Sequence, residues 1–311
     1  MKPIMRNYRD ENDYWRIRQF LREVFLLNNR LEHSWHIARW EYLRWHMIEN
    51  CHVCGPLEEV TSIWEAPDGQ ITAVLNPIEP EEAFIHIHPA YRTPDLEAEI
   101  IIHAERTFRT TYPDGHRRLY VPVDEDDHFR KEVLRKLGYE GKGNPGWEHY
   151  HDLDGALPDP QVTPGYTVRS MGDINEHPAR SWASWQSFHS NEPEGNYDGD
   201  WSWFANVQRC PLYRRDLDVV AATDDGQIAS FCTILYDDVT RSAVTKLVGT
   251  AAPHWRRGLG KAVIFEGMRR LQRLGCTRVF AKADDEIADL FYSSTMAHRY
   301  ISETWFKDYG S

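Results

Sequence analysis

A short loop that combines glycines with basic side chains is the stretch of this sequence best suited to chemistry. It reads Arg256-Arg257-Gly258-Leu259-Gly260-Lys261. Glycines allow the backbone to close around phosphate oxygens, and cationic side chains attract anions. A helix that begins directly after such a loop adds free N–H donors and the positive end of its dipole. These residue types therefore predict a site for a phosphate-containing ligand.

Two predicted elements position this loop. The residues before it are rich in β-branched side chains and predict a strand at 242–250, followed by a turn with Pro253. After the loop, a helix is predicted at 259–275, with Gly275 suited to end it. Its apolar residues keep helical spacing at Ala262, Phe265, Met268, Leu271 and Leu274. The predicted order is strand, basic glycine loop, helix.

Known phosphate motifs narrow the choice of ligand. A Walker loop requires Ser or Thr after its lysine, but Ala262 follows Lys261, and a dinucleotide fingerprint requires a third glycine that is absent. The stretch resembles motif A of the GNAT N-acetyltransferase superfamily, (Q/R)xxGx(G/A). Gly258 and Gly260 match the motif, and Trp255 stands at its first position. The resemblance implies that the loop holds the pyrophosphate of acetyl-coenzyme A (acetyl-CoA).

The same resemblance implies roles for individual residues. Acetyl-CoA, as co-substrate, is expected to contact Val248, Gly249, Thr250, Arg256, Arg257, Gly258, Leu259, Gly260 and Lys261. Backbone N–H groups of 248–250 are expected to polarise the thioester carbonyl. Tyr292 is expected to protonate the leaving thiolate. A register shifted by one residue would put Phe291 at that position and leave no acid there.

An acidic loop with interleaved aromatic residues is the predicted acceptor site. In the GNAT fold the corresponding loop borders the acceptor, so the predicted substrate-binding residues are Glu192, Glu194, Asp198 and Trp201. Carboxylates and aromatic faces attract an ammonium group. The same pattern is compatible with a solvated acidic loop packed on core tryptophans. For the general base, the sequence offers His189 as a candidate without a partner.

Other reactive side chains have weaker patterns. Three histidine pairs have spacings that a metal could use, but none has a third ligand at a convincing spacing: His33 and His36, His86 and His88, His149 and His151. No metal is predicted. Cys51 and Cys54 form a single CxxC without a second pair. An odd total of 5 cysteines favours reduced thiols and a cytoplasmic protein.

Composition limits the classes of protein to which this chain can belong. A chain of 311 residues with 41% hydrophobic residues is long enough for two domains with sizeable cores. Its net charge of −12 argues against a nucleic-acid partner and suits a small-molecule amine substrate. No apolar run is long enough for a membrane span, and the N-terminus lacks the apolar core of a signal peptide. The oligomeric state is not predicted.

The order of predicted elements occurs twice along the chain. Prolines and glycines at 154–165 predict a linker between a first domain, 1–153, and a second domain, 166–311. The predicted fold class is α/β (α+β), with two tandem GNAT-like domains that are each a mixed, mostly antiparallel sheet flanked by helices. In the first half the counterpart of the glycine loop is 89–95, which contains no glycine. That half is therefore expected to be degenerate and not to bind acetyl-CoA.

The predicted function is an N-acetyltransferase that moves an acetyl group from acetyl-CoA to a primary amine by direct transfer. Two other classes stay open. One is a non-catalytic protein that binds a coenzyme A ligand or acts in regulation. The other is a mycothiol synthase-like acyltransferase, because tandem GNAT architectures also include such enzymes.

Overall fold

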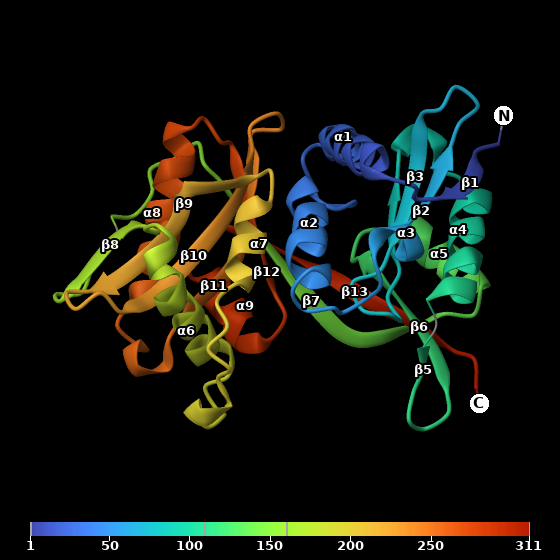
Figure 1. The fold of residues 1–311 in the computed structure, drawn as a ribbon. Helices are drawn as coiled ribbons and strands as arrows, with labels where there is room; N and C mark the ends of the chain where they lie inside the picture. Colours follow the sequence, from blue (N-terminus) through green and yellow to red (C-terminus); the bar gives the residue numbers. More distant parts are fainter. Residues whose placement is uncertain (1, 109, 160, 311) are drawn as a thin grey trace. The chain divides into compact units, whose positions relative to one another are not determined.

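The computed structural model describes residues 2–108, 110–159 and 161–310, which form two compact units (Figure 1). Unit 1 contains the chain up to Glu148 and the C-terminal segment from Tyr300, and unit 2 contains His149–Arg299. These limits differ from the expected domains 1–153 and 166–311, and Pro160 of the expected linker lies outside the described residues. Both boundaries between the units fall inside strands. Strand pairing, rather than loop composition, decides which unit a segment joins.

Unit 1 contains a four-stranded antiparallel sheet in the order β1-β2-β3-β4. Its strands are β1 (Ile4–Asn7), β2 (Ser62–Glu65), β3 (Ile71–Asn76) and β4 (Phe84–Ile87). The side chains of β2, β3 and β4 are buried on both faces of the sheet, whereas β1 is a largely exposed edge strand.

The second sheet region of unit 1 includes the end of the chain. Its strands are β5 (Thr110–Thr111), β6 (Arg117–Asp124), β7 (Glu140–Asp152) and β13 (His298–Asp308). Strand β6 pairs antiparallel with β13, with Pro122 opposite Thr304. Alternate residues Leu119, Val121 and Val123 of β6 are buried, as expected for a strand with one face on the core.

Helices cover these strands. They are α1 (Glu11–Leu27), α2 (Ile37–Tyr42), the π-helical η1 (Leu43–Ile48), α3 (Leu57–Val60), the 3₁₀ turn η2 (Pro89–Tyr91), α4 (Pro94–Thr107) and α5 (His128–Lys136). Asp10 caps α1 by accepting hydrogen bonds from the backbone N–H groups of Asn12 and Asp13. Tyr14, Ile17, Leu21 and Val24 of α1 are buried at helical spacing.

Unit 2 has the strand order β12-β11-β10-β9-β8, with the last residues of β7 beside β12. Its strands are β8 (Tyr166–Ser170), β9 (Tyr213–Thr223), β10 (Ile228–Asp237), β11 (Ser242–Thr250) and β12 (Arg278–Ala283). Its helical elements are η3 (Ile174–Glu176), α6 (His177–Phe188), η4 (Glu194–Asn196), α7 (Trp203–Arg209), η5 (Ala252–His254), α8 (Leu259–Arg273) and α9 (Glu286–Ser293).

Helix α8 packs closely on the sheet of unit 2. A Cβ added at Gly267 would lie 2.4 Å from Cδ1 of Ile234 on β10, so only glycine allows this approach. Leu259, Val263 and Leu271 of α8 are buried, and Gly275 follows the helix with a φ of 78°. The predicted strand, loop and helix at 242–275 therefore form as expected.

The predicted architecture of mixed, mostly antiparallel sheets flanked by helices is confirmed. All strand pairs that the structure gives in full are antiparallel except β11 with β12, which is parallel. Among the described residues, no helix combines the length and apolarity needed to cross a membrane.

Candidate functional site

Strands β11 and β12 of unit 2 pair over only a short distance. Their parallel register runs from Ser242 opposite Arg278 to Val244 opposite Phe280. Within the described residues, Val248–Thr250 then pair with β10 alone, and all three are half-buried. One edge of this segment therefore keeps backbone donors and acceptors that no neighbouring strand uses, as an extended ligand requires.

A β-bulge lies in the same segment of β11. The register with β10 shifts between Cys232 opposite Val248 and Thr233 opposite Lys246, which leaves Leu247 as the extra residue. Leu247 has a φ of 53°, in the left-handed region that residues with a Cβ rarely adopt. A bulge bends its strand and redirects the residues after it, here Val248–Thr250, which the sequence predicted to contact acetyl-CoA.

The start of α8 offers backbone donors. Gly258 occupies the N-cap position with a φ of 74°, and no side chain caps the first turn. The first intrahelical bond that the loop makes runs from the N–H of Ala262 to the carbonyl of Gly258. The N–H groups of the helix residues before Ala262 therefore remain available to an anion. The helix dipole also favours negative charge at this end.

The predicted basic residues surround this helix start. Arg256, Arg257 and Lys261 are exposed, whereas Leu259 is buried in the core. Trp255, which replaces the Gln or Arg of the motif, donates a hydrogen bond from Nε1 to the carbonyl of Thr250 at 2.6 Å. Its indole thus ties the loop to the end of β11, and half of the side chain stays exposed.

Two predicted glycines lie where other side chains approach closely. A Cβ at Gly249 would meet Cζ of Phe231 at 2.5 Å and Cβ of Ser187, on α6, at 2.9 Å. A Cβ at Gly260 would lie 3.1 Å from the ring of Phe291 on α9. The glycines therefore bring α6, β11, α8 and α9 together around the loop.

Tyr292, the predicted acid, is buried on α9. Burial raises the pKa of its hydroxyl well above the ordinary value, the nearby Cys232 raises it further, and a hydrogen bond with the Thr245 side chain acts against this increase. Thr245 is on β11, so the hydroxyl of Tyr292 lies near the point where β11 and β12 separate. A phenol that keeps its proton at neutral pH can supply one to a leaving thiolate.

A histidine that the sequence did not single out as a base lies beside Tyr292. The ring centroids of His149 and Tyr292 are 5.8 Å apart, and Nε2 of His149 is 2.9 Å from Oδ1 of Asp289. Asp289 also binds Arg299 through two hydrogen bonds, which lower the pKa of Asp289 and keep it ionised. An ionised carboxylate only accepts, so Nε2 of His149 carries the proton.

The second ring nitrogen of His149 is therefore a lone-pair acceptor. Burial lowers the pKa of His149, which keeps the imidazole neutral, and its side chain has 0% exposure. Within the described part of the chain, Nδ1 is buried and has no hydrogen-bond partner. Sequence spacing could not reveal this pair, because 140 residues separate its members. The one local signal is that Asp289 precedes Tyr292 by one helical turn.

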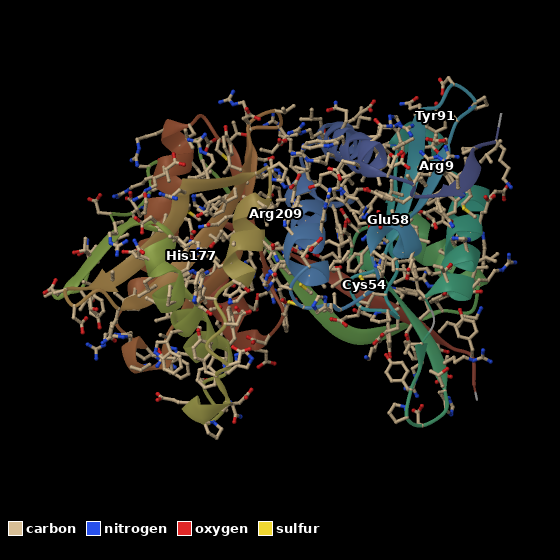
Figure 2. The ribbon with its side chains drawn as sticks, in the orientation of Figure 1. Arg9, Cys54, Glu58, Tyr91, His177 and Arg209 are labelled. Carbon is tan, nitrogen blue, oxygen red and sulfur yellow. The ribbon has the colours of Figure 1, made fainter. Side chains whose placement is uncertain are left out.

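The predicted acceptor loop lies beyond the end of α6. Glu192, Glu194 and Asp198 are exposed, and Trp201 is half-buried against His177, which Figure 2 labels on α6. Trp182 and Trp185 of α6 stack with ring planes 7° apart, and both contact Tyr197 of the loop. Helix α6 therefore contacts the loop through its tryptophans and Gly249 through Ser187.

Unit 1 has a different helix start at the counterpart of the glycine loop. Thr93 caps α4 by accepting a hydrogen bond from the N–H of Leu96, and Pro94 removes a donor. The nearby Arg92 binds Asp127 through two hydrogen bonds of 2.6 and 2.7 Å and Glu97 through a third. In unit 1 one donor is therefore capped, one is absent and the charge of Arg92 is paired, unlike at α8.

Comparisons with known proteins agree with this geometry. Residues 178–296 match the model of the acetyltransferase (GNAT) family. No curated protein matches the sequence. A GCN5-related N-acetyltransferase from Sphaerobacter thermophilus has a TM-score of 0.64 at 17% identity, and the match covers 99% of this chain and 96% of that chain.

Two further solved structures have the same fold. A tandem GNAT protein from the clavulanic acid biosynthesis pathway has a TM-score of 0.65 at 13% identity, covering 100% of this chain and 99% of that one. A GNAT-family acetyltransferase from Colwellia psychrerythraea has a TM-score of 0.59 at 9% identity, covering 98% and 100%. Identities this low show a shared fold and nothing about substrates.

The family match and the shared fold confirm the resemblance seen in the glycine loop. The first half shares the architecture but not the loop chemistry. Residues 178–296 match the GNAT acetyltransferase family, and the chain as a whole shares the fold of a solved tandem GNAT protein.

Proposed function

We propose that unit 2 transfers an acetyl group from acetyl-CoA to a primary amine of a small molecule, directly and without an acyl-enzyme. The observation that carries this proposal is the edge of Val248–Thr250 on β11, which no neighbouring strand uses, leading into the uncapped N-terminus of α8. An extended pantetheine arm can pair with such an edge, and a pyrophosphate can accept hydrogen bonds from such a helix start.

The residues around the loop fit acetyl-CoA, which supplies the activated acetyl thioester. The N–H groups of Leu259, Gly260 and Lys261 suit phosphate oxygens, and Arg256 and Arg257 add positive charge from the solvent side. The backbone of Val248–Thr250 suits the thioester carbonyl, because the bulge at Leu247 turns it away from regular pairing.

Two residues are assigned to proton transfer. The neutral His149 accepts the proton that the attacking amine loses, through the lone pair on Nδ1. Tyr292 donates its proton to the departing sulfur as the bond between the acetyl carbon and sulfur breaks. The new bond joins the amine nitrogen to the acetyl carbon, so the tyrosine and histidine exchange one proton afterwards to restore their starting states.

The acidic loop supports an amine acceptor. Glu192, Glu194 and Asp198 are exposed beside the stacked Trp182 and Trp185. Carboxylates raise the local concentration of ammonium ions, and aromatic faces favour their binding. These residues therefore favour a cationic acceptor over a neutral or anionic one.

Calorimetry tests whether the glycine loop binds acetyl-CoA. Gly258→Asp and Gly260→Asp each bring a carboxylate to the helix start and are expected to abolish binding. Gly226→Asp is the matched control, because Gly226 also has a positive φ of 89° and open space around it but lies in the turn between β9 and β10. Unchanged binding in both loop variants would refute the site.

Thiol release tests the activity. Purified protein is incubated with acetyl-CoA and a panel of primary amines, and free coenzyme A is measured over time. Release that depends on an amine supports the acetyltransferase. If acetyl-CoA binds but no amine in a broad panel increases thiol release, the chain belongs to the alternative class of proteins that bind a coenzyme A ligand without turnover.

A further inference from the structure

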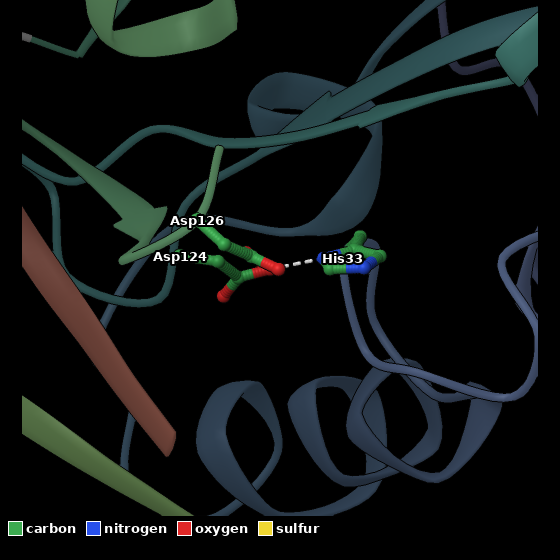
Figure 3. A group of neighbouring side chains, drawn as sticks. All are labelled: His33, Asp124 and Asp126. Atoms are coloured by element: carbon green, nitrogen blue, oxygen red, sulfur yellow. Dashed lines mark hydrogen bonds and ion pairs between the residues drawn. The ribbon is translucent and has the colours of Figure 1, made fainter. Parts of the chain in front are cut away.

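We propose that unit 1 contains a site for a divalent first-row transition metal, such as Zn²⁺ or Mn²⁺, formed by His33, Asp124 and Asp126. Each residue offers one ligand atom, and these atoms all lie within 4.8 Å of one another. Figure 3 shows the two aspartates, at the end of β6 and in the turn after it, beside the imidazole of His33. Nδ1 of His33 is 2.8 Å from Oδ2 of Asp124.

The two aspartates are held in place by the backbone. Asp124 is the last residue of β6, and a turn closes behind it through a hydrogen bond from the N–H of Asp127 to the Asp124 carbonyl at 3.0 Å. Glu125 within that turn donates its N–H to the carbonyl of Ile301 at 2.9 Å. Both carboxylates therefore project from an anchored turn rather than from a free loop.

The segment that carries His33 is also anchored. The preceding Glu32 binds Arg39 through two hydrogen bonds of 2.7 Å, and the N–H of Trp35 donates to Nδ1 of His86 at 3.2 Å. His33 itself is half-buried, with 32% side-chain exposure. Its ring consequently faces the carboxylates without a large loss of freedom on metal binding.

The neighbouring arginines make their hydrogen bonds to other carboxylates. Asp127 is paired with Arg92, and Arg130 binds Glu97. In the part of the chain that the structure describes, the Asp126 carboxylate has no hydrogen-bond or ion-pair partner, and Asp124 is paired only with His33. One imidazole and two carboxylates form a donor set that Zn²⁺ and Mn²⁺ both accept.

A cavity of about 330 Å³ lies beside the cluster and leaves room for further ligands of the metal. His33 and Asp126 line it together with Ile87, the last residue of β4, Pro89, which begins η2, and His128, which begins α5. Three protein ligands with an open side toward a cavity are typical of metal sites that bind water or a small ligand.

Other histidine–aspartate pairs among the described residues lack this arrangement. His116 of unit 1 binds Asp308 at 2.9 Å, but among the described residues only the His33 group brings three ligand atoms together. The sequence predicted no metal because it offered His33 only His36 as a neighbour. The ligands come instead from segments about 90 residues apart in the chain.

Zn²⁺ titration by calorimetry tests the site. The full chain is prepared metal-free with Cys51→Ala and Cys54→Ala, which removes the only CxxC as a competing thiol site. In this background we expect Zn²⁺ to bind, and Asp126→Asn or His33→Gln to weaken it at least about 10-fold. His116→Gln is the matched control and is expected to leave the affinity unchanged.

Mn²⁺ titration followed by electron paramagnetic resonance provides an independent measurement, because Mn²⁺ has little affinity for thiols. Asp126 is exposed, so Asp126→Asn keeps the fold, which circular dichroism verifies. Equal affinity of the parent and Asp126→Asn for both metals would overturn the proposal. A loss of Zn²⁺ affinity in His116→Gln as large as that in His33→Gln would overturn it as well.

Discussion

His149 and Asp289 are joined by a hydrogen bond of 2.9 Å between Nε2 and Oδ1, across 140 residues of chain. Arg299 keeps Asp289 ionised, so the aspartate fixes the proton on Nε2 and leaves Nδ1 as the basic atom. The ring lies beside Tyr292, the buried tyrosine of α9. A neutral imidazole and a protonated phenol thus lie close together, as the proposed proton transfers require.

Replacement of Tyr292 by Phe is expected to lower kcat by about 10²–10³-fold, because the leaving thiolate loses its proton donor. Calorimetry should find acetyl-CoA affinity nearly unchanged, since the ring remains. Tyr236→Phe is the matched control: Tyr236 is also buried in unit 2 and donates to the carbonyl of Leu274 at 3.2 Å. A loss of kcat in the control equal to that in Tyr292→Phe would assign the effect to stability.

The pH dependence of kcat/KM should report His149. Burial lowers the pKa of His149 below its ordinary value of about 6.5, so the base is lost only as pH falls below that range. Asp289 opposes the decrease, because its hydrogen bond and charge raise the pKa of His149. Asp289→Asn therefore shifts the acid limb of the profile to lower pH, whereas an acid limb that does not move would rule out His149 as the titrating base.

Substitution of Gly249 by Ala should damage the site by steric conflict. The new methyl group would lie 2.5 Å from Phe231 and 2.9 Å from Ser187, which forces β11 and α6 apart and costs about 1–3 kcal/mol of stability. Thermal unfolding measures the cost, and Phe231→Leu in the same chain should recover part of it. Gly226→Ala, with no atom within 4 Å of its Cβ, serves as the control without a clash.

Each chain is expected to bind one acetyl-CoA. The start of α8 is free of side-chain caps, whereas Thr93 caps α4 and Asp127 and Glu97 neutralise Arg92 in unit 1. Calorimetry should therefore give a stoichiometry near one, and Arg92→Ala should leave both stoichiometry and affinity unchanged. Two equivalents of acetyl-CoA per chain would show that unit 1 also binds the ligand.

The acidic loop should determine KM for the acceptor. For an amine that supports thiol release, Glu192→Gln combined with Asp198→Asn is expected to raise the acceptor KM several-fold without changing kcat, because both groups attract the ammonium before reaction. Added salt should reduce the difference between wild type and variant. Asp224→Asn removes an exposed carboxylate from the turn between β9 and β10 and should have no effect.

Much of unit 2 could be predicted from local sequence. The β-branched run, the glycines and the helical spacing at 242–275 determine β11, the loop and α8, because each depends on neighbours close in the chain. The same logic identified the first half as a related fold with a different loop. The limits of the units could not be predicted, because β13 joins unit 1 through pairing with β6, far away in sequence.

The sequence by itself determined which residue types stand at the start of α8, and therefore that a phosphate-containing ligand suits this helix. Only the tertiary structure brought His149 to Asp289 and Tyr292, and His33 to Asp124 and Asp126. A helix start is a local property of consecutive residues. A proton-transfer pair or a metal site depends on side chains from distant segments, whose meeting is decided by strand register and packing.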